Sequence, residues 1–286
     1  MSMPRRARTA LIGAAAGVVL LAATWYAAHY VALGRSVDAS ILRGFADLTR
    51  PRLDRVANFI ANLCSPNEYV FLAALPVIVA LVRGRPRVAA MLAIVLLCAN
   101  ESTQLLKPLL SGPRDPVQWV PLGGATWPSG HATAAMSLAL CSVIAAPARL
   151  RPAVATAMAA FAVAVSYSFL ELAWHYPSDV LGGFLVAGTW TLLGVAGLSI
   201  FEARGAGRVA EAGPARRASF SVGEALAPVA VLGAVACVLL ALIVIARPHE
   251  VVTYVREHEA FVLGALSIGA LGMLLASGLT LMLRRT

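Results

Sequence analysis

Three short polar stretches carry residue types that suit phosphoryl-group chemistry. The first, LLKPLLSGPRDP over residues 105–116, contains Lys107, the only lysine among 286 residues, and Arg114 seven residues later. Two cations on a short loop can hold a phosphate, and Gly112-Pro113 can fold that loop back. We therefore interpret this stretch as a candidate phosphate-binding loop.

The second stretch, WPSGH over residues 127–131, has the pattern of a helix start. Pro128 and Ser129 stand where a helix would begin, so free backbone N–H groups and the positive end of the helix dipole would face an anion. His131 lies in the expected first turn, where it can give or take a proton.

The third stretch, WHYPSD over residues 174–179, pairs a histidine with a carboxylate. Pro177 again marks a helix start, and Asp179 lies four residues beyond His175. A carboxylate there can hydrogen-bond one imidazole nitrogen and leave the other free to attack. The three stretches together predict a phosphoryl-transfer site with one histidine as nucleophile and the other as general acid.

Composition indicates the kind of molecule that carries these stretches. Hydrophobic residues make up 59% of the chain and charged residues 13%. Apolar runs of about 16–24 residues suit helices that cross a ~30 Å hydrocarbon core. We expect an all-α, polytopic membrane helical bundle with a six-helix core and two extra C-terminal spans. The eight expected spans are roughly 10–32, 67–82, 88–106, 130–147, 152–170, 180–201, 225–246 and 260–283.

The placement of arginine predicts the orientation of these spans. With the N-terminus in the cytoplasm, 14 of the 23 lysine and arginine residues fall on the inner side, and both termini lie inside. The net charge of +9 is then mostly a topology signal, and a nucleic-acid partner has little support. The inner positions are Arg5, Arg6, Arg8, Arg83, Arg85, Arg87, Arg149, Arg151, Arg204, Arg208, Arg216, Arg217, Arg284 and Arg285.

Counting membrane crossings puts the three polar stretches on the same face, which this orientation makes the outer, periplasmic one. We expect four regions: an N-terminal span with an outer segment (1–55), a core with the three motifs (56–201), a flexible cytoplasmic linker (202–224) and a two-helix appendix (225–286). Within residues 34–66 the apolar spacing predicts an amphipathic helix in the membrane interface.

We expect no cofactor and no metal ion. The sequence has no cluster of carboxylates and no Cys/His array. A zinc site made from His131, His175 and Asp179 is disfavoured because Lys107 and Arg114 would repel the cation. No pattern in the sequence specifies an oligomeric state.

Over about residues 56–200 the chain resembles the type 2 phosphatidic acid phosphatase superfamily, which is related to acid phosphatases and vanadium haloperoxidases. The family's first motif is a lysine followed, after six residues, by Arg-Pro, and it reads here as KPLLSGPRDP. The second motif, Pro-Ser-Gly-His, is intact. The third motif is Ser-Arg, then five residues, a histidine, three residues and an aspartate, and it reads here as SFLELAWHYPSD. The resemblance implies a metal-independent phosphatase in which His175 forms a phosphohistidine, Asp179 orients it and His131 protonates the leaving group. It also implies that four residues hold the phosphoryl oxygens: Lys107, Arg114, Ser129 and Gly130.

Two positions depart from the family pattern. Phe169 follows Ser168 where the third motif has arginine, which removes one phosphate ligand. Asp115 follows Arg114 where proline is expected, and its carboxylate can partly neutralise that arginine. Because a charged hydrogen bond contributes roughly 1.5–3 kcal/mol, we expect activity to be reduced about tenfold or more.

The resulting hypothesis is a multi-pass plasma (inner) membrane phosphatase acting on a phospholipid or polyprenyl phosphate or pyrophosphate at the outer leaflet. Two alternatives remain open. One is a phosphotransferase that uses a lipid or sugar acceptor instead of water. The other is a catalytically impaired lipid-phosphate binder or transporter, which the phenylalanine at position 169 motivates.

Overall fold

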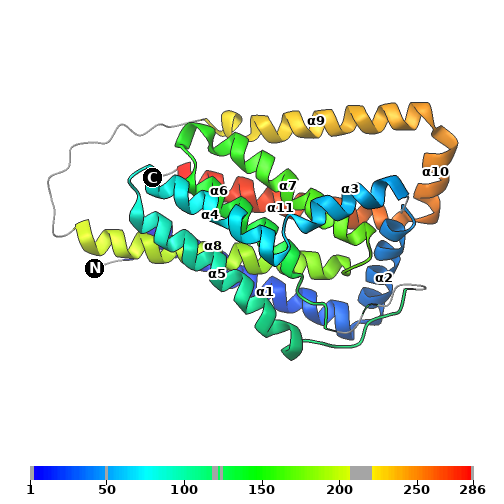
Figure 1. Ribbon diagram of the computed structural model, residues 1–286, viewed down its shortest axis with the longest axis horizontal. Coiled ribbons are helices and arrows are strands. Elements are labelled where there is room, and N and C mark those ends of the chain that lie inside the picture. The colour runs from blue at the N-terminus through cyan, green and yellow to red at the C-terminus, as the bar shows by residue number, and fades with distance from the viewer. Residues whose placement is uncertain (1–2, 49–50, 118–121, 123–124, 207–220, 285–286) are drawn as a thin grey trace.

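The computed structural model describes residues 3–48, 51–117, 122, 125–206 and 221–284, and the regular secondary structure of these residues is entirely helical. This confirms the predicted all-α, polytopic bundle (Figure 1). The elements are α1 (Arg5–Tyr30), α2 (Ala32–Ala46), α3 (Pro51–Asn62), α4 (Pro66–Val82), α5 (Pro86–Leu109), α6 (Gly130–Ala145), the 3-10 turn η1 (Ala148–Leu150), α7 (Arg151–Glu171), α8 (Pro177–Ala206), α9 (Val222–Ala246), α10 (Pro248–Glu257) and α11 (Glu259–Arg284).

Each of the eight expected spans corresponds to a helix, but the helices differ in length. Among the described residues, six are long and apolar enough to cross a membrane: α1, α5, α7 with η1, α8, α9 and α11. A bent pair, α3 and α4, meets at 58° and is a seventh candidate. Helix α6 has 16 residues, about 24 Å at 1.5 Å per residue, and is shorter than a ~30 Å hydrocarbon core.

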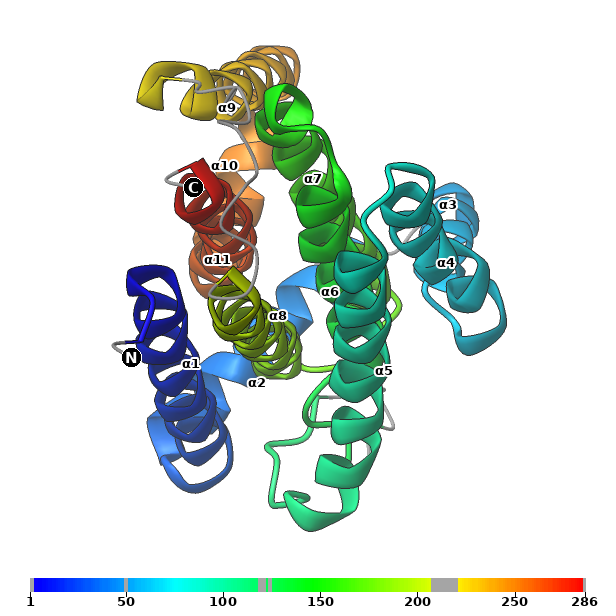
Figure 2. The same cartoon turned by 90° about the vertical axis from the view of Figure 1, so that its left-hand side faces the viewer.

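The short helix α6 lies at the centre of the bundle. From Ala132 to Ala145 every residue except Ser142 is buried, and α6 contacts α5, α7 and α8. Figure 2 shows α6 and α8 in the middle, with α1, α5, α7 and α11 around them. A helix surrounded by other helices needs no polar face, which explains why its sequence is apolar on all sides.

The C-terminal helices differ in how they contact this core. Helix α11 packs against α2, α6, α7 and α8, and the Tyr167 hydroxyl donates a hydrogen bond to the carbonyl of Ala265. Helix α9 lies on the outside of the bundle, and its apolar window has no buried residue (Figure 2). Of the expected linker 202–224, residues 202–206 continue α8, 207–220 lie outside the described residues, and α9 starts at Val222.

The outer segment 34–66 forms helices α2 and α3. Helix α3 turns small residues, Ala57 and Ala61, inward and leaves Leu53, Val56 and Phe59 exposed. An apolar surface of this kind suits contact with lipid, and the position of α3 in the membrane interface stays a prediction.

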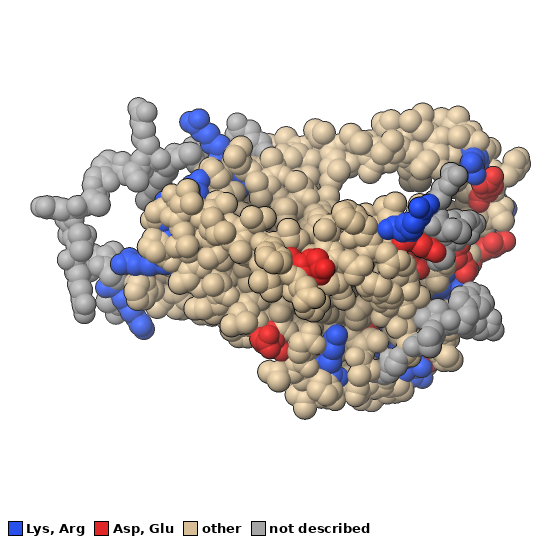
Figure 3. Space-filling model, viewed as in Figure 1, with Lys and Arg blue, Asp and Glu red and all other residues tan. Residues whose placement is uncertain are grey.

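The two ends of the bundle differ in charge. One end, here called the arginine end, contains the starts of α1, α5 and α7 and the end of α11. Basic side chains lie on it without acidic neighbours in the view of Figure 3, whereas acidic side chains gather toward the other end. That other end, here called the motif end, contains the last turn of α5 and the starts of α6 and α8. The structure therefore places all three polar stretches at one end, as the counting of crossings predicts.

Candidate active site

The start of α6 is tied to the start of α8. Ser129 caps α6 by accepting a hydrogen bond from the Ala132 N–H at 3.2 Å, and its own N–H donates to the backbone carbonyl of Asp179 at 2.9 Å. Gly183 permits this approach, because a Cβ at that position would lie 2.7 Å from the Ser129 carbonyl oxygen. The second and third motifs are therefore held together by backbone contacts.

The turn that ends α7 sets the position of His175. Ala173 adopts a left-handed conformation with φ 54°, the Trp174 N–H donates to the carbonyl of Phe169 at 2.9 Å, and the Ala173 N–H donates to the carbonyl of Leu170 at 3.0 Å. These two bonds form a Schellman motif, which stops the helix and reverses the chain. His175 follows directly, before α8 begins at Pro177.

The predicted contact between His175 and Asp179 is present. The Nδ1 atom of His175 lies 3.2 Å from Oδ2 of Asp179, and the same oxygen accepts the Tyr176 N–H at 3.0 Å. A carboxylate only accepts hydrogen bonds, so we assign the ring proton to Nδ1 and the free lone pair to Nε2. The Asp179 side chain is fully buried, and that of His175 is 9% exposed.

The rings of the two histidines lie close to one another, although only His131 lines a pocket. Their ring centroids are 6.3 Å apart, with the planes inclined at 62°. Phe169 is fully buried and lies against both rings, with its centroid 5.3 Å from that of His175 and 6.0 Å from that of His131. The residue that replaces the motif arginine is thus in contact with both candidate catalytic groups.

Lys107 reaches the start of α6 from the last turn of α5. A Cβ at Gly130 would lie 3.9 Å from Nζ of Lys107 and 3.2 Å from Nε2 of Gln104. Both donors therefore flank the helix start where an anion is expected. Gln104 is an additional donor that no motif contains.

A pocket of about 710 Å³ opens beside these groups, between α4, α5 and α6. Lys107, Gly130 and His131 line it, and Val70, Val77 and Leu97 are among its apolar lining residues. The pocket therefore offers a cation and a histidine together with an apolar wall.

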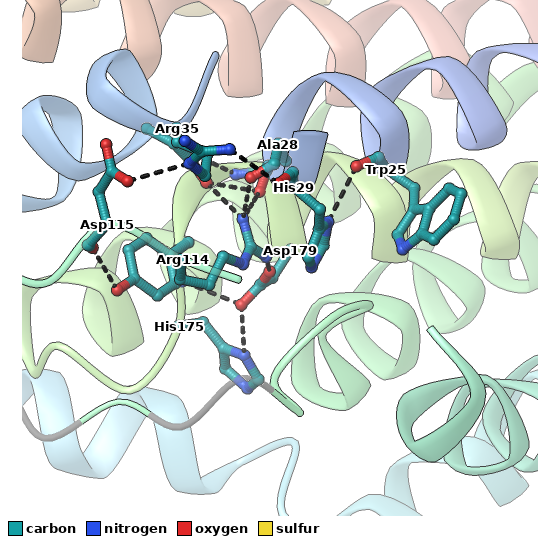
Figure 4. A network of polar contacts seen from close by, with 11 residues as sticks. Trp25, Ala28, His29, Arg35, Arg114, Asp115, His175 and Asp179 are labelled. Carbon is teal, nitrogen blue, oxygen red and sulfur yellow. Dashed lines mark hydrogen bonds and ion pairs between the residues drawn. The ribbon is translucent and has the colours of Figure 1, made fainter. Parts of the chain in front are cut away.

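Arg114 lies away from that pocket, in a network with two carboxylates (Figure 4). Its Nη1 is 2.8 Å from Oδ2 of Asp38 and 2.9 Å from Oγ of Ser178, and its Nη2 pairs with Oδ1 of Asp179. The arginine side chain is only 4% exposed. Asp179 thus lies between Arg114 and His175 and bonds to both.

Asp38 is a member of this network that motif reasoning missed. It lies on α2, and its Oδ1 accepts the backbone N–H of Ser178 at 2.9 Å. Burial raises the pKa of Asp38 to about 6, and Arg114 opposes that shift. The only sign of Asp38 in the sequence was its position in the outer segment, as an acidic residue three positions after Arg35.

The contact expected between Asp115 and Arg114 is absent. The Asp115 carboxylate pairs with Nε of Arg35 at 3.0 Å, and its backbone carbonyl accepts the Tyr176 hydroxyl at 2.9 Å (Figure 4). Arg114 is neutralised by Asp38 and Asp179, because these carboxylates reach its buried guanidinium from α2 and α8.

The described side chains at this site do not form a cluster of metal ligands. In the part of the chain that the structure describes, no three or more His, Cys, Asp or Glu side chains form a group that could hold a metal ion. The polar groups that converge here are instead two imidazoles, an ammonium group and an amide.

Comparison with known proteins identifies the class of this fold and site. Residues 83–200, which contain all three motifs, match the family model of the PAP2 superfamily. This match confirms the resemblance over that segment. The family match supports a phosphatase.

One solved structure with the same fold is described as the crystal structure of the first transmembrane PAP2 type phosphatidylglycerolphosphate phosphatase from Bacillus subtilis. The two chains superpose with a TM-score of 0.55 at 20% identity, over 68% of this chain and 98% of the other. No curated protein matches the chain. The multi-pass helical architecture is therefore shared with a membrane phosphatase.

Proposed function

We propose that the protein is an integral membrane lipid phosphatase that hydrolyses a phosphate monoester or pyrophosphate of a phospholipid or polyprenyl lipid. The observation that carries this proposal is the pair of imidazoles, 6.3 Å apart, beside the Lys107 ammonium group and the start of α6. The arrangement offers a nucleophile, a proton donor and an anion-binding helix end around one space.

His175 acts as the nucleophile in this mechanism. Its Nε2 lone pair attacks phosphorus, an N–P bond forms, and the P–O bond to the lipid breaks while His131 gives its proton to the leaving oxygen. Asp179 stabilises the positive charge that develops on the His175 ring. Water then attacks the phosphohistidine with His131 accepting a proton, which releases phosphate and restores His175.

Lys107, the Gly130 N–H and Ser129 hold the phosphoryl oxygens, and Gln104 can add a donor. The motif assigns Arg114 to the same task. Its contacts with Asp38 and Asp179 support a positioning role instead, in which Arg114 fixes the carboxylate that orients His175. Phosphate binding by Arg114 stays a prediction of the resemblance.

The pocket supports a lipid as the substrate. Its apolar wall can hold an acyl or prenyl chain, while Lys107 and His131 meet the phosphate. The excess of arginine at the opposite end supports a cytoplasmic position for the arginine end and an outer-leaflet position for the site.

The test is phosphate release by the purified protein in detergent from a panel of lipid phosphates: phosphatidic acid, phosphatidylglycerol phosphate and polyprenyl pyrophosphate. We expect release from at least one lipid, unchanged by a chelator and lost in His175→Ala. Rapid quenching with a ³²P-labelled substrate should trap acid-labile label on the wild type only. Equal rates for wild type and His175→Ala would reject the assigned nucleophile.

The buried phenylalanine favours a second candidate, a lipid-phosphate binder without turnover. Phe169 packs on both histidines where the motif has a phosphate-binding arginine. The same panel separates the two functions. Retention of a polyprenyl phosphate through purification, with no phosphate released from any lipid, would support the binder.

A further inference from the structure

A second cationic pocket lies at the arginine end, on the opposite side of the bundle from the motifs. Its volume is about 110 Å³. Arg6 of α1, Arg85 before α5 and Arg151 of α7 line it, together with Ser199 and Glu202 of α8. Three separate parts of the chain therefore each place one arginine at the same cavity.

These guanidinium groups have few partners in the described part of the chain. None forms an ion pair within 4.0 Å; Arg85 donates to the Ile144 carbonyl at 3.1 Å, and Arg151 donates to the Leu283 carbonyl at 3.4 Å. The Nε atoms of Arg6 and Arg151 are buried and have no hydrogen-bond partner. Since a guanidinium carries five N–H donors, most of these donors are not bonded to protein groups.

The charge around the cavity is unbalanced. Three arginines and one glutamate give a net charge of 3 − 1 = +2, and Glu202 is itself exposed. Excess positive charge in a partly buried site is unfavourable unless an anion offsets it. Burial lowers the pKa of Arg85, as does the neighbouring Arg83, while Glu202 raises it.

Membrane topology alone does not account for this arrangement. Topology requires positive charge at the cytoplasmic end, and exposed residues such as Arg5, Arg8 and Arg149 supply it in contact with water. Long basic side chains usually extend outward to reach water. Arg6 and Arg151 instead turn part of each guanidinium inward, toward a shared cavity.

We propose that this pocket binds the phosphate group of an anionic membrane lipid in the leaflet at the arginine end. Three guanidinium groups on one cavity suit the paired N–H···O bonds that arginine makes with phosphate. A volume of 110 Å³ has room for a few waters at about 30 Å³ each, and so for a phosphate group, while the acyl chains would lie outside along the helices. Basic pockets between membrane helices on the cytoplasmic side are the usual form of such sites.

A bound headgroup would join α1, α7 and α8 at the end where their spans begin or finish. The site is separate from the phosphatase pocket, so it does not depend on the proposed function. Such binding would stabilise the folded protein, so the melting temperature should be higher when the lipid is present.

The experiment uses the full-length protein, stripped of lipid in detergent, with two matched double variants. Arg6→Gln with Arg151→Gln changes the pocket, and Arg5→Gln with Arg149→Gln removes the same charge from exposed positions on the same two segments. Binding of phosphatidylglycerol, phosphatidylcholine and inorganic phosphate is followed by native mass spectrometry and by melting temperature. Both pairs leave the motif end unchanged, so lipid bound there contributes equally to each.

We expect the pocket pair to bind phosphatidylglycerol about tenfold more weakly than the wild type and to lose its thermal shift. The surface pair should bind like the wild type, and phosphatidylcholine should bind all three proteins equally. If the pocket pair does not fold, Arg6→Lys with Arg151→Lys keeps the charge without the bidentate geometry and should still weaken binding.

Two results would overturn the proposal. An equal loss in the pocket pair and the surface pair would mean that overall charge, and not the pocket, attracts the lipid. Inorganic phosphate that displaces phosphatidylglycerol from the wild type at equal concentration would assign the pocket to the free anion.

Discussion

At the scale of single residues, the site is a line of four side chains in which each one fixes the next. Asp38 holds Arg114, Arg114 holds Asp179, and Asp179 holds Nδ1 of His175. The Asp179 carboxylate, which contacts the proposed nucleophile through one oxygen, therefore has its second oxygen bonded to a buried cation. A nucleophile fixed in this way loses little entropy when it attacks.

The two histidines should respond differently to the leaving group. His131→Ala removes the proposed proton donor, so hydrolysis of a lipid phosphate should fall by about 10²–10⁴-fold. Hydrolysis of p-nitrophenyl phosphate should fall much less, because its leaving group needs no proton. His175→Ala removes the proposed nucleophile and should abolish both reactions. Steady-state rates on the two substrates make the comparison, and a similar loss on both substrates in His131→Ala would exclude the general-acid role.

Asp38 should impose a pH dependence on stability. Its pKa in the folded protein is about 6, above the ordinary value of 3.8, so between these values the folded chain keeps a proton that the unfolded chain has released. The contribution of Asp38 to stability therefore falls as pH rises from about 4 to 6, by about 3 kcal/mol, and is flat above that range.

The Asp38→Asn variant has no carboxyl group that titrates at this position and serves as the reference. The melting temperature of the wild type minus that of Asp38→Asn should shrink from pH 4 to 6 and then stay constant. The measurement is thermal unfolding in detergent across this range. A difference that does not change with pH would show that Asp38 titrates near its ordinary value in the fold.

Phe169 should limit the rate. Phe169→Arg returns a cation beside both imidazoles, where one charged hydrogen bond to phosphate is worth about 1.5–3 kcal/mol. Its kcat/KM should exceed that of Phe169→Leu by about tenfold, although its melting temperature should fall because a buried ring is lost. Phe169→Leu controls for that loss, and equal kcat/KM values in the two variants would show that the missing cation is not limiting.

At the scale of elements, the features that depend on a local sequence pattern could be predicted from the sequence. Apolar length predicted the eight helices, and Pro128 and Pro177 predicted the two helix starts. Asp38 was missed because it lies 140 residues before its partner Ser178 and belongs to no motif. The contacts of Arg114 could not be predicted from the sequence either, because its two partner carboxylates, Asp38 and Asp179, lie on different helices.

The close approach of α6 and α8 should depend on Gly183. In Gly183→Ala the added methyl would meet the Ser129 carbonyl at 2.7 Å and the Thr133 nitrogen at 3.0 Å, both backbone atoms that cannot move freely. We expect a loss of about 1–3 kcal/mol in stability. Activity should fall as well, because the shift separates the α6 start from Asp179.

Gly197→Ala is the matched control on the same helix. A Cβ at Gly197 would have nothing within 4 Å, so this variant should be neutral or slightly stabilising. Unfolding and phosphate release are measured on both variants. Equal behaviour of the two alanine variants would mean that the tight α6–α8 approach is not needed for the site.

At the scale of the whole molecule, the bundle separates two kinds of anion chemistry. The motif end carries imidazoles and one ammonium group, where we propose that a substrate phosphate reacts, and the arginine end carries guanidinium groups, where we propose that a lipid phosphate stays bound. Helices α5, α7 and α8 run between the two ends. If the proposed function holds, the orientation of the protein in the membrane determines which leaflet supplies the substrate, so this orientation is the property to measure.

Single cysteines on either side of α6 can report that orientation. Ser111 lies after α5 at the motif end, Arg149 lies after α6 at the arginine end, and both are exposed. In a background with Cys64, Cys98, Cys141 and Cys237 replaced, Ser111→Cys and Arg149→Cys are treated with a membrane-impermeant maleimide in intact cells. Because positive charge is retained in the cytoplasm, Ser111→Cys should react in intact cells, whereas Arg149→Cys should react only after lysis. The reverse pattern would place the site at the inner leaflet, and the substrate would then be an inner-leaflet lipid phosphate.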